Sequence, residues 1–255
     1  MLKRYLVLLL TVCCTAFCLC GCGYEENENI VLENELPQAK TEITPDIPEP
    51  ENPEKEVTEE EKIESVYLEG KEKTFCIFTS NGGNGTGFLY KDKYVITNAH
   101  VLYDADDFTL KDAKEQEYKG TVIFNDFETD IVIIQIDNYQ GESVKFGDSD
   151  SIVVGESVIL IGNPLDGEPF SYCTGKRVEL EDPFCEQVNS REWYIPVDAN
   201  IVSGYSGGPV FNLSGELVGI SNASYIGDLS AYEFDYLSFI IPINKIKELI
   251  ESYCV

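Results

Sequence analysis

The stretch Gly204-Tyr205-Ser206-Gly207-Gly208-Pro209-Val210 decides how this chain of 255 residues is interpreted. Glycines on both sides of Ser206 let the backbone turn tightly and aim its N–H groups at one point. A turn of this kind usually belongs to a hairpin, so its meaning depends on what stands elsewhere in the sequence. The chain contains a single histidine, His100, which lies well before this turn.

Two apolar segments place suitable partners for Ser206 earlier in the chain. His100 stands in the apolar run of residues 94–102, and Asp130 opens another, residues 130–137. A serine hydroxyl needs an adjacent base, and imidazole suits that task near neutral pH. A carboxylate behind the ring fixes its tautomer and stabilises the imidazolium. We therefore take His100, Asp130 and Ser206 as candidate base, orienting carboxylate and nucleophile, and the amides of Gly204 and Ser206 as candidate oxyanion hole.

Several motifs in the same order extend this pattern into a family resemblance. Gly85-Thr-Gly-Phe-Leu-Tyr90, followed by residues 94–102, resembles the "GSGF…VLTAAHV" segment of trypsin-like proteases. The segment from Asp130 resembles the "DLAVLKI" strand of their bacterial HtrA/Deg-type branch. Leu160-Ile-Gly-Asn-Pro164 and Ser238-Phe-Ile-Ile-Pro-Ile243 also match that branch. The resemblance covers roughly residues 72–250.

The resemblance implies an all-β, chymotrypsin-like fold of two six-stranded antiparallel barrels with a C-terminal helix from about Asn244. His100 and Asp130 then belong to the first barrel and Ser206 to the second, with the site at their junction. Apolar runs and turn signals predict the strands 75–80, 85–90, 94–102, 107–111, 118–124 and 131–137, and then 157–162, 171–180, 193–197, 208–212, 217–224 and 237–241.

The chain also departs from the family pattern. Tyr205 precedes the serine where relatives usually have Asp or Asn, so activation by capture of a new N-terminus is not expected. No sequence after the protease region would form the PDZ module typical of the branch, since the chain ends at Val255.

The resemblance also indicates which residues contact a substrate. The position six before the nucleophile commonly lines the primary specificity pocket, and here it is Asn200, a neutral residue that favours uncharged side chains. A shifted loop would bring in Asp198 instead. Ser221, Asn222 and Ala223 are expected to form an edge strand that pairs with polypeptide substrates in extended conformation.

The first residues are an export signal. Lys3 and Arg4 precede an apolar run that is too short to span a membrane comfortably. The run ends in Leu19-Cys20-Gly21-Cys22, which resembles a bacterial lipobox. We expect residues 1–21 to be removed and Cys22 to be lipidated, anchoring the protein on the extracytoplasmic side of the cell membrane. The alternative is an ordinary signal peptide cut elsewhere.

Residues 22–65 are predicted to be a disordered acidic tether, and residues 66–255 the protease domain. Residues 24–65 carry fifteen Asp/Glu against three Lys and are rich in proline, so they cannot bury enough surface to fold. Residues 66–255 hold thirteen Lys/Arg against thirty-one Asp/Glu, which makes binding to nucleic acid implausible. No metal or cofactor is expected, the lipid anchor is the one expected membrane contact, and the sequence does not indicate an oligomeric state.

Four cysteines follow Cys22, and export permits disulfides between them. We favour a bond between Cys173 and Cys185, while Cys76 and Cys254 form either a terminal staple or two buried thiols; three connectivities are open.

The function that best fits these features is serine endopeptidase. The main alternative is a protease fold kept as a catalytically weak or inactive binding module at the cell surface. An esterase is less consistent: Gly204-Tyr205-Ser206-Gly207-Gly208 fits the letters of the GxSxG motif, but α/β-hydrolases place that motif on a strand-to-helix turn, whereas a strand is predicted here for residues 208–212.

Overall fold

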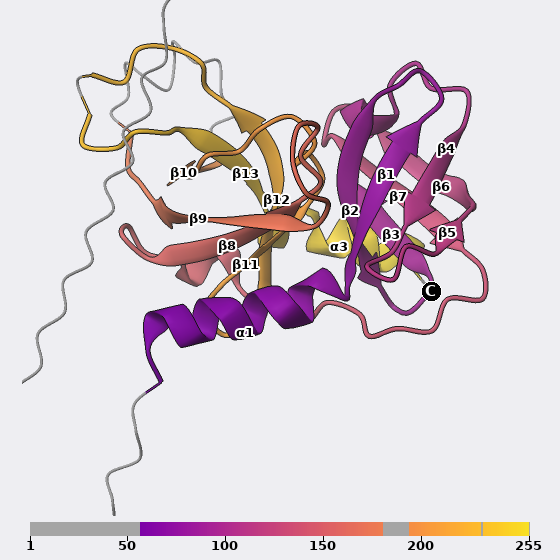
Figure 1. Cartoon of the computed structure of the whole chain (residues 1–255), viewed down its shortest axis with the longest axis horizontal. Coiled ribbons are helices and arrows are strands. Elements are labelled where there is room, and N and C mark those ends of the chain that lie inside the picture. The colour runs from indigo at the N-terminus through magenta and orange to yellow at the C-terminus, as the bar shows by residue number, and fades with distance from the viewer. Residues whose placement is uncertain (1–56, 181–193, 231, 255) are drawn as a thin grey trace, which may run out of the picture. The chain divides into compact units, whose positions relative to one another are not determined.

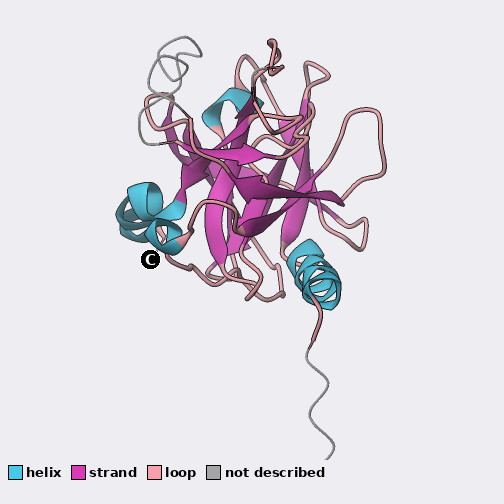
Figure 2. Cartoon of the chain, turned by 90° about the vertical axis from the view of Figure 1, so that its left-hand side faces the viewer, coloured by secondary structure: helices cyan, strands magenta, loops and turns pink. Residues whose placement is uncertain are grey.

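Strands dominate this computed structural model, which describes residues 57–180, 194–230 and 232–254 (Figures 1 and 2). All of these residues belong to one unit, Glu54–Val255. The expected signal peptide, Cys22 and most of the expected tether lie outside the described residues.

A helix occupies the boundary where the sequence predicted disorder. Helix α1 spans Glu59–Lys71, so the predicted tether, residues 22–65, extends too far. Thr58 caps it: the Thr58 hydroxyl accepts from the Glu61 N–H at 3.2 Å, and the Glu61 carboxylate accepts from the Thr58 N–H at 2.9 Å. Such a capping box satisfies two backbone donors that the first turn otherwise leaves unpaired. Gly70 then seats the helix against the side chains of Ile161 and Phe211.

The first sheet has seven antiparallel strands in the order β5-β4-β1-β2-β3-β7-β6, and it curls (Figure 1). The sequence predicted six strands here. Asp112 accepts the N–H groups of Lys114 and Gln116, which forms the turn of a short hairpin between β4 and β5. The strand predicted for residues 118–124 is therefore divided, with β5 ending at Tyr118 and β6 beginning at Gly120. The bounds are β1 Thr74–Thr79, β2 Asn84–Tyr90, β3 Tyr94–Thr97, β4 Phe108–Lys111, β5 Glu117–Tyr118, β6 Gly120–Asp126 and β7 Ile131–Ile136.

The second sheet is a closed six-stranded barrel in the order β10-β13-β12-β11-β8-β9, as expected. Its strands are β8 Ser157–Gly162, β9 Ser171–Arg177, β10 Ile195–Asp198, β11 Pro209–Phe211, β12 Leu217–Ser224 and β13 Ser238–Pro242. Helix α3, Ile243–Tyr253, follows β13 directly, which confirms the predicted C-terminal helix.

Two central strands bury both of their faces, and this joins the two sheets. In β8, Val158 and Leu160 point into the barrel core, whereas Ile159 and Ile161 join a cluster shared with the first sheet. Strand β7 alternates in the same way, with Ile131 and Ile133 in the shared cluster. Because side chains alternate across a strand, a strand buried on both faces is a continuous apolar run. The shared core fixes the first sheet against the barrel.

Candidate active site

His100 lies in a short 3-10 helix, Ala99–Leu102, and not in the strand predicted for residues 94–102. Strand β3 ends at Thr97, and the chain is then drawn toward Asp130. The Ala99 N–H and the Asn98 side-chain amide both donate to the Asp130 carbonyl oxygen, at 3.1 and 2.9 Å. These bonds present the imidazole at the surface, where 45% of its side chain is exposed.

Asp130 directs its carboxylate at His100. The residue adopts a left-handed conformation, with φ of 59°, immediately before β7 begins. Its Oδ2 lies 2.7 Å from His100 Nδ1, and its Oδ1 accepts the His100 backbone N–H at 2.9 Å. The Asn222 side-chain amide donates to the same Oδ2 at 2.6 Å. The carboxylate therefore holds both the ring and the backbone of His100.

These contacts keep Asp130 ionised. Burial by itself would raise the pKa of Asp130, because it disfavours the charged form. The hydrogen bond and charge of His100, followed by the His100 backbone N–H and the Asn222 amide, outweigh burial and place the pKa below its ordinary value of 3.8.

The turn that carries Ser206 requires its glycines. Gly204 and Gly207 have φ of 102° and 81°, in the region that favours glycine. A Cβ atom on Gly207 would overlap the Thr97 hydroxyl and the Thr86 carbonyl, so the turn is pressed onto the first sheet. The Thr86 N–H donates to the Ser206 carbonyl at 2.9 Å, which holds the serine at the junction.

The candidate oxyanion hole is shaped by the segment after β8. The Leu165 N–H donates to the Ser203 carbonyl at 3.0 Å. In a planar trans peptide the C=O and the following N–H point in opposite directions, so the Gly204 N–H points away from Leu165. Within the described part of the chain, the N–H groups of Gly204 and Ser206 have no acceptor. Two unpaired donors on one turn can receive a negatively charged oxygen.

Asn222 brings the three candidate residues together. Its side-chain amide donates to Asp130, and its backbone carbonyl oxygen accepts from Ser206 Oγ at 3.3 Å. Among the described residues, no hydrogen bond joins Ser206 to His100. Hydrogen bonds of this kind are often long before substrate binds. The sequence assigned Asn222 to the substrate and missed its contact with the carboxylate, because nothing in the sequence pairs residues 130 and 222.

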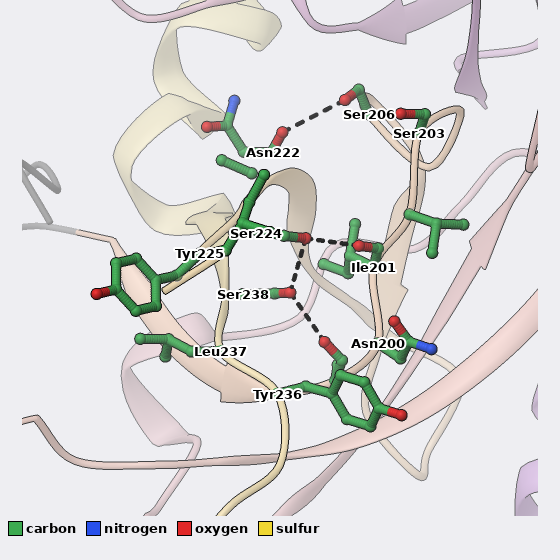
Figure 3. A pocket seen from close by; sticks show the side chains of 14 residues that line it. Asn200, Ile201, Ser203, Ser206, Asn222, Ser224, Tyr225, Tyr236, Leu237 and Ser238 are labelled. Carbon is green, nitrogen blue, oxygen red and sulfur yellow. Dashed lines mark hydrogen bonds between the residues drawn. The ribbon is translucent and has the colours of Figure 1, made fainter. Parts of the chain in front are cut away.

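A hollow of about 630 Å³ lies beside Ser206 (Figure 3). Asn200, Asn222 and Ala223, three of the residues that the sequence assigned to substrate binding, line it. Ser221 does not: it is fully buried, and its backbone binds the glycine-rich turn around Ser206, accepting from the Gly207 N–H at 2.8 Å and donating to the Gly208 carbonyl at 2.9 Å. Both backbone groups of Ser221 are thus already bonded, so Ser221 is not available for the substrate pairing that the sequence predicted for it. The further residues that line the hollow are Ala199, Ile201, Val202, Ser203, Ser224, Tyr225, Ile226, Tyr236, Leu237 and Ser238.

Other predictions concern groups around this site. Tyr205 points inward, with 4% exposed, and packs against Gly162. Cys76, Cys173 and Cys254 are free thiols. Cys76 and Cys254 are therefore two buried thiols and not a terminal staple, and Cys173 does not form the favoured bond to Cys185, which lies outside the described residues. The described residues hold no cluster of His, Cys, Asp and Glu that could bind a metal. Among their helices, none is long and apolar enough to cross a membrane.

Comparison with known proteins shows the family to which this chain belongs. The family model for the trypsin-like peptidase domain matches residues 85–220, which include His100, Asp130 and Ser206. The chain belongs to the trypsin-like peptidase family. Among curated relatives, the "Probable periplasmic serine endoprotease DegP-like" of Pseudomonas putida (strain W619) is 34% identical over 161 residues, covering 63% of this chain and 32% of that protein.

Further similarities agree with this assignment. The "Probable periplasmic serine protease do/HhoA-like" of Haemophilus influenzae is 32% identical over 67% of this chain and 36% of that protein. This trypsin-like chain thus spans about a third of the length of these relatives. The solved structure of the HtrA-type protease AlgW with a tripeptide has a TM-score of 0.65 at 24% identity, covering 75% of this chain and 63% of that one. Rv3671c from M. tuberculosis has a TM-score of 0.60 at 20% identity, covering 74% and 89%. Both show the same fold.

Proposed function

We propose that this protein is a serine endopeptidase that cleaves extended polypeptides with Ser206 as nucleophile. The observation that carries the proposal is the position of the Asp130 carboxylate, 2.7 Å from His100 Nδ1, with Asn222 linking it to Ser206. Asp130 keeps the Nδ1 proton in place, which leaves Nε2 of His100 free to take a proton. The periplasmic serine endoproteases that this chain resembles support the same chemistry.

The reaction follows from these positions. Nε2 of His100 accepts the Ser206 hydroxyl proton as Oγ attacks the substrate carbonyl carbon. The N–H groups of Gly204 and Ser206 stabilise the oxyanion of the tetrahedral intermediate. His100 then protonates the departing amine, leaving an acyl-enzyme at Ser206. Water attacks the ester with His100 again as base, and the free carboxylic acid is released.

The edge of β12 supports binding of extended peptides. Residues Ala223 and Ser224 pair with β13 on one side. On the other side, β12 pairs with β11 at Leu217, Gly219 and Ile220, the backbone of Ser221 bonds to Gly207 and Gly208, and the pairing ends there. The free edge beside the hollow can therefore pair with a substrate backbone.

We also propose that the protein is exported and held by a lipid on Cys22. The lipobox-like spacing supports the anchor, and the periplasmic names of the relatives support export. Replacing Cys22 by Ala should move the protein from the membrane to the soluble fraction. An intact mass that places an unmodified N-terminus at another residue would refute the anchor.

Replacement of the proposed triad tests the main proposal. Ala at Ser206, His100 or Asp130 should each lower kcat by about four to six orders of magnitude, and the effects should not add, because the three groups act as one unit. Ser214→Ala, in an exposed turn, is the matched control and should keep full activity. Near-normal turnover by purified Ser206→Ala protein would overturn the assignment.

The alternative of a binding module is favoured by one observation, the bond from Ser206 Oγ to Asn222 in place of His100. A fluorophosphonate probe separates the two functions, because it reacts only with an activated serine. Labelling of folded wild-type protein, absent in Ser206→Ala, is expected for the peptidase. Folded wild-type protein that stays unlabelled would indicate the binding module.

A further inference from the structure

Tyr205, the residue directly before Ser206, turns its side chain away from the candidate site and into the barrel. The residue is 4% exposed and belongs to the apolar cluster of the barrel core. Gly162, the last residue of β8, makes room for the ring: a Cβ atom on Gly162 would overlap it. The ring of Tyr205 therefore rests directly on the backbone of β8.

The hydroxyl at the end of this ring has a partner on the neighbouring strand. It forms a hydrogen bond with the thiol of Cys173, in β9. Cys173 pairs in register with Leu160 of β8, so the Tyr205 side chain connects the two strands. Burial raises the pKa of Tyr205 above its ordinary value and raises the pKa of Cys173 to about 12. Both groups therefore keep their hydrogens at neutral pH, and the bond is one between neutral groups.

The backbone of Tyr205 is bonded on both sides as well. Its N–H donates to the Val202 carbonyl at 3.1 Å, and its carbonyl oxygen accepts from the Gly208 N–H at 2.9 Å. The Tyr205 carbonyl and the Ser206 N–H belong to one planar trans peptide, so they point in opposite directions. The direction of the Ser206 N–H, one of the two candidate oxyanion donors, is thus set by the way Tyr205 is held.

The glycines around Tyr205 and Ser206 add little stiffness of their own. Gly204 and Gly207 both have positive φ, and glycine is free to adopt many other conformations. Rotation of the peptide between residues 205 and 206 would bring its carbonyl oxygen toward the site in place of the N–H. The Tyr205 side chain opposes this rotation, because both its ring and its hydroxyl are fixed in the barrel core.

We propose that Tyr205 is a positioning residue, which uses its hydrogen bond to Cys173 to hold the Ser206 N–H in the direction that the oxyanion requires. This inference rests on the proposed peptidase function. It gives a role to a residue at which the chain departs from the family pattern. It also gives a role to a thiol that the sequence assigned to a disulfide.

Removal of the Tyr205 hydroxyl tests this role in the full-length protein. Tyr205→Phe keeps the ring on Gly162 and deletes only the bond to Cys173. With fluorescein-labelled casein as substrate, we expect kcat to fall by about tenfold with little change in KM, because the oxyanion forms only after attack; losing an oxyanion donor outright costs about 100-fold or more. A merely structural role would lower the stability of the protein and leave kcat of the folded protein unchanged, and that result overturns the inference.

Changes at Cys173 should reproduce the loss. Cys173→Ala should lower kcat as far as Tyr205→Phe does, and the double variant should be no worse than either, because both changes delete the same bond. Cys173→Ser keeps a hydrogen-bonding atom and should recover most of the activity. Cys173 is only partly buried, so its variants carry the test if Tyr205→Phe does not fold. Losses that add in the double variant overturn the inference.

Tyr118→Phe is the matched control. The Tyr118 hydroxyl also forms hydrogen bonds, to Asp112 at 3.1 Å and to Gln116 at 2.8 Å, but it lies in β5 of the first sheet. Its kcat and KM should equal those of wild-type protein. A loss as large as that of Tyr205→Phe would show that any missing tyrosine hydroxyl lowers turnover, and would overturn the inference.

Hydrogen exchange separates this inference from the proposed function. The Gly208 N–H donates to the Tyr205 carbonyl, so its exchange rate, measured by NMR on folded Ser206→Ala protein, reports the turn without any turnover. Adding Tyr205→Phe or Cys173→Ala should speed this exchange by at least about fivefold, since a bond that holds the turn is lost. Faster exchange supports the inference even if wild-type protein cleaves nothing. Exchange that is unchanged in both variants overturns it.

Discussion

The Leu165 N–H and the Ser203 carbonyl oxygen lie 3.0 Å apart, and this bond fixes the direction of the peptide that carries the Gly204 N–H. Without it, the peptide between Ser203 and Gly204 would be free to rotate and turn its oxygen toward the site. A negatively charged intermediate would then meet an acceptor in place of a donor. The bond comes from outside the glycine-rich turn, in a segment that contacts neither Ser206 nor His100 through a hydrogen bond.

Removal of this donor should reduce turnover. Leu165→Pro deletes the N–H, whereas Leu165→Ala keeps it and alters only a side chain that is 62% exposed. We expect Leu165→Pro to lower kcat by about 100-fold with little change in KM, the usual cost of losing one oxyanion donor. Leu165→Ala should behave like wild-type protein. Equal activity of the two variants would contradict the role assigned to this bond.

Activity should depend on the hydrogen-bond donor of the Asn222 side-chain amide as well as on its size. Asn222→Asp places a second carboxylate against Asp130, where the amide now donates at 2.6 Å. Like charges at this distance raise the pKa of one of the pair, so the Asp130 carboxylate no longer acts alone on His100. We expect a loss of kcat/KM of at least about 100-fold at pH 7. Asn222→Leu, similar in size and uncharged, should lose less; a greater loss in Asn222→Leu would show that packing is what matters.

The lowered pKa of Asp130 links stability to pH. Because the folded pKa lies below the ordinary value of 3.8, ionised Asp130 stabilises the fold at neutral pH. That contribution is lost as the pH falls below 3.8 and through the folded pKa. Unfolding by urea between pH 6 and pH 2 should show wild-type protein losing stability relative to Asp130→Asn. A difference between the two proteins that stays constant across this range would contradict the assignment.

The three free thiols among the described residues should be slow to react in the folded protein. Burial raises the pKa of Cys76, Cys173 and Cys254 to about 12 each, so almost none is thiolate at pH 8. Iodoacetamide at pH 8, followed by peptide mapping, should leave these cysteines unmodified in native protein and modify all three in urea. Rapid modification of Cys173 in native protein would show that its site opens readily.

The cap of α1 should contribute measurably to stability. Thr58→Ala removes the hydroxyl that accepts the Glu61 N–H, at an expected cost of about 1 kcal/mol in the free energy of unfolding. Thr58→Ser keeps an equivalent hydroxyl and should cost much less. Urea denaturation of the two variants measures the difference, and equal stabilities would mean that α1 unfolds independently of the sheets.

Apolar patterning predicts the sheets well because burial is what the strands share. Strands β7 and β8 bury both faces, so their continuous apolar runs are visible in the sequence. The pattern fails at short range near His100, where bonds to the Asp130 carbonyl end the strand early. At Thr58 the sequence prediction fails for a different reason. The acidic composition predicted disorder, although Thr58 and Glu61 form a capping box that begins a helix.

The site is predictable only in part. The glycine-rich turn and the order of His100, Asp130 and Ser206 point to the chemistry, because that chemistry limits which side chains can serve. The contact of Asn222 with Asp130 depends on how the two sheets pack against each other. A single sequence carries no signal for such pairs.

The docking of α1 determines how the folded domain responds to mechanical force. A pull on the chain before Thr58 reaches the fold first through this helix, whose early turns are fastened by Glu59 to the Ser157 hydroxyl at 2.7 Å and whose last turn is seated at Gly70. Peeling would begin at Glu59 and travel toward Gly70. Each residue that leaves the helix changes its length along the chain from about 1.5 Å to about 3.4 Å. Unwinding of α1 therefore lengthens the chain before tension reaches β1. Under force, α1 is thus expected to unfold before the two sheets that carry the proposed triad.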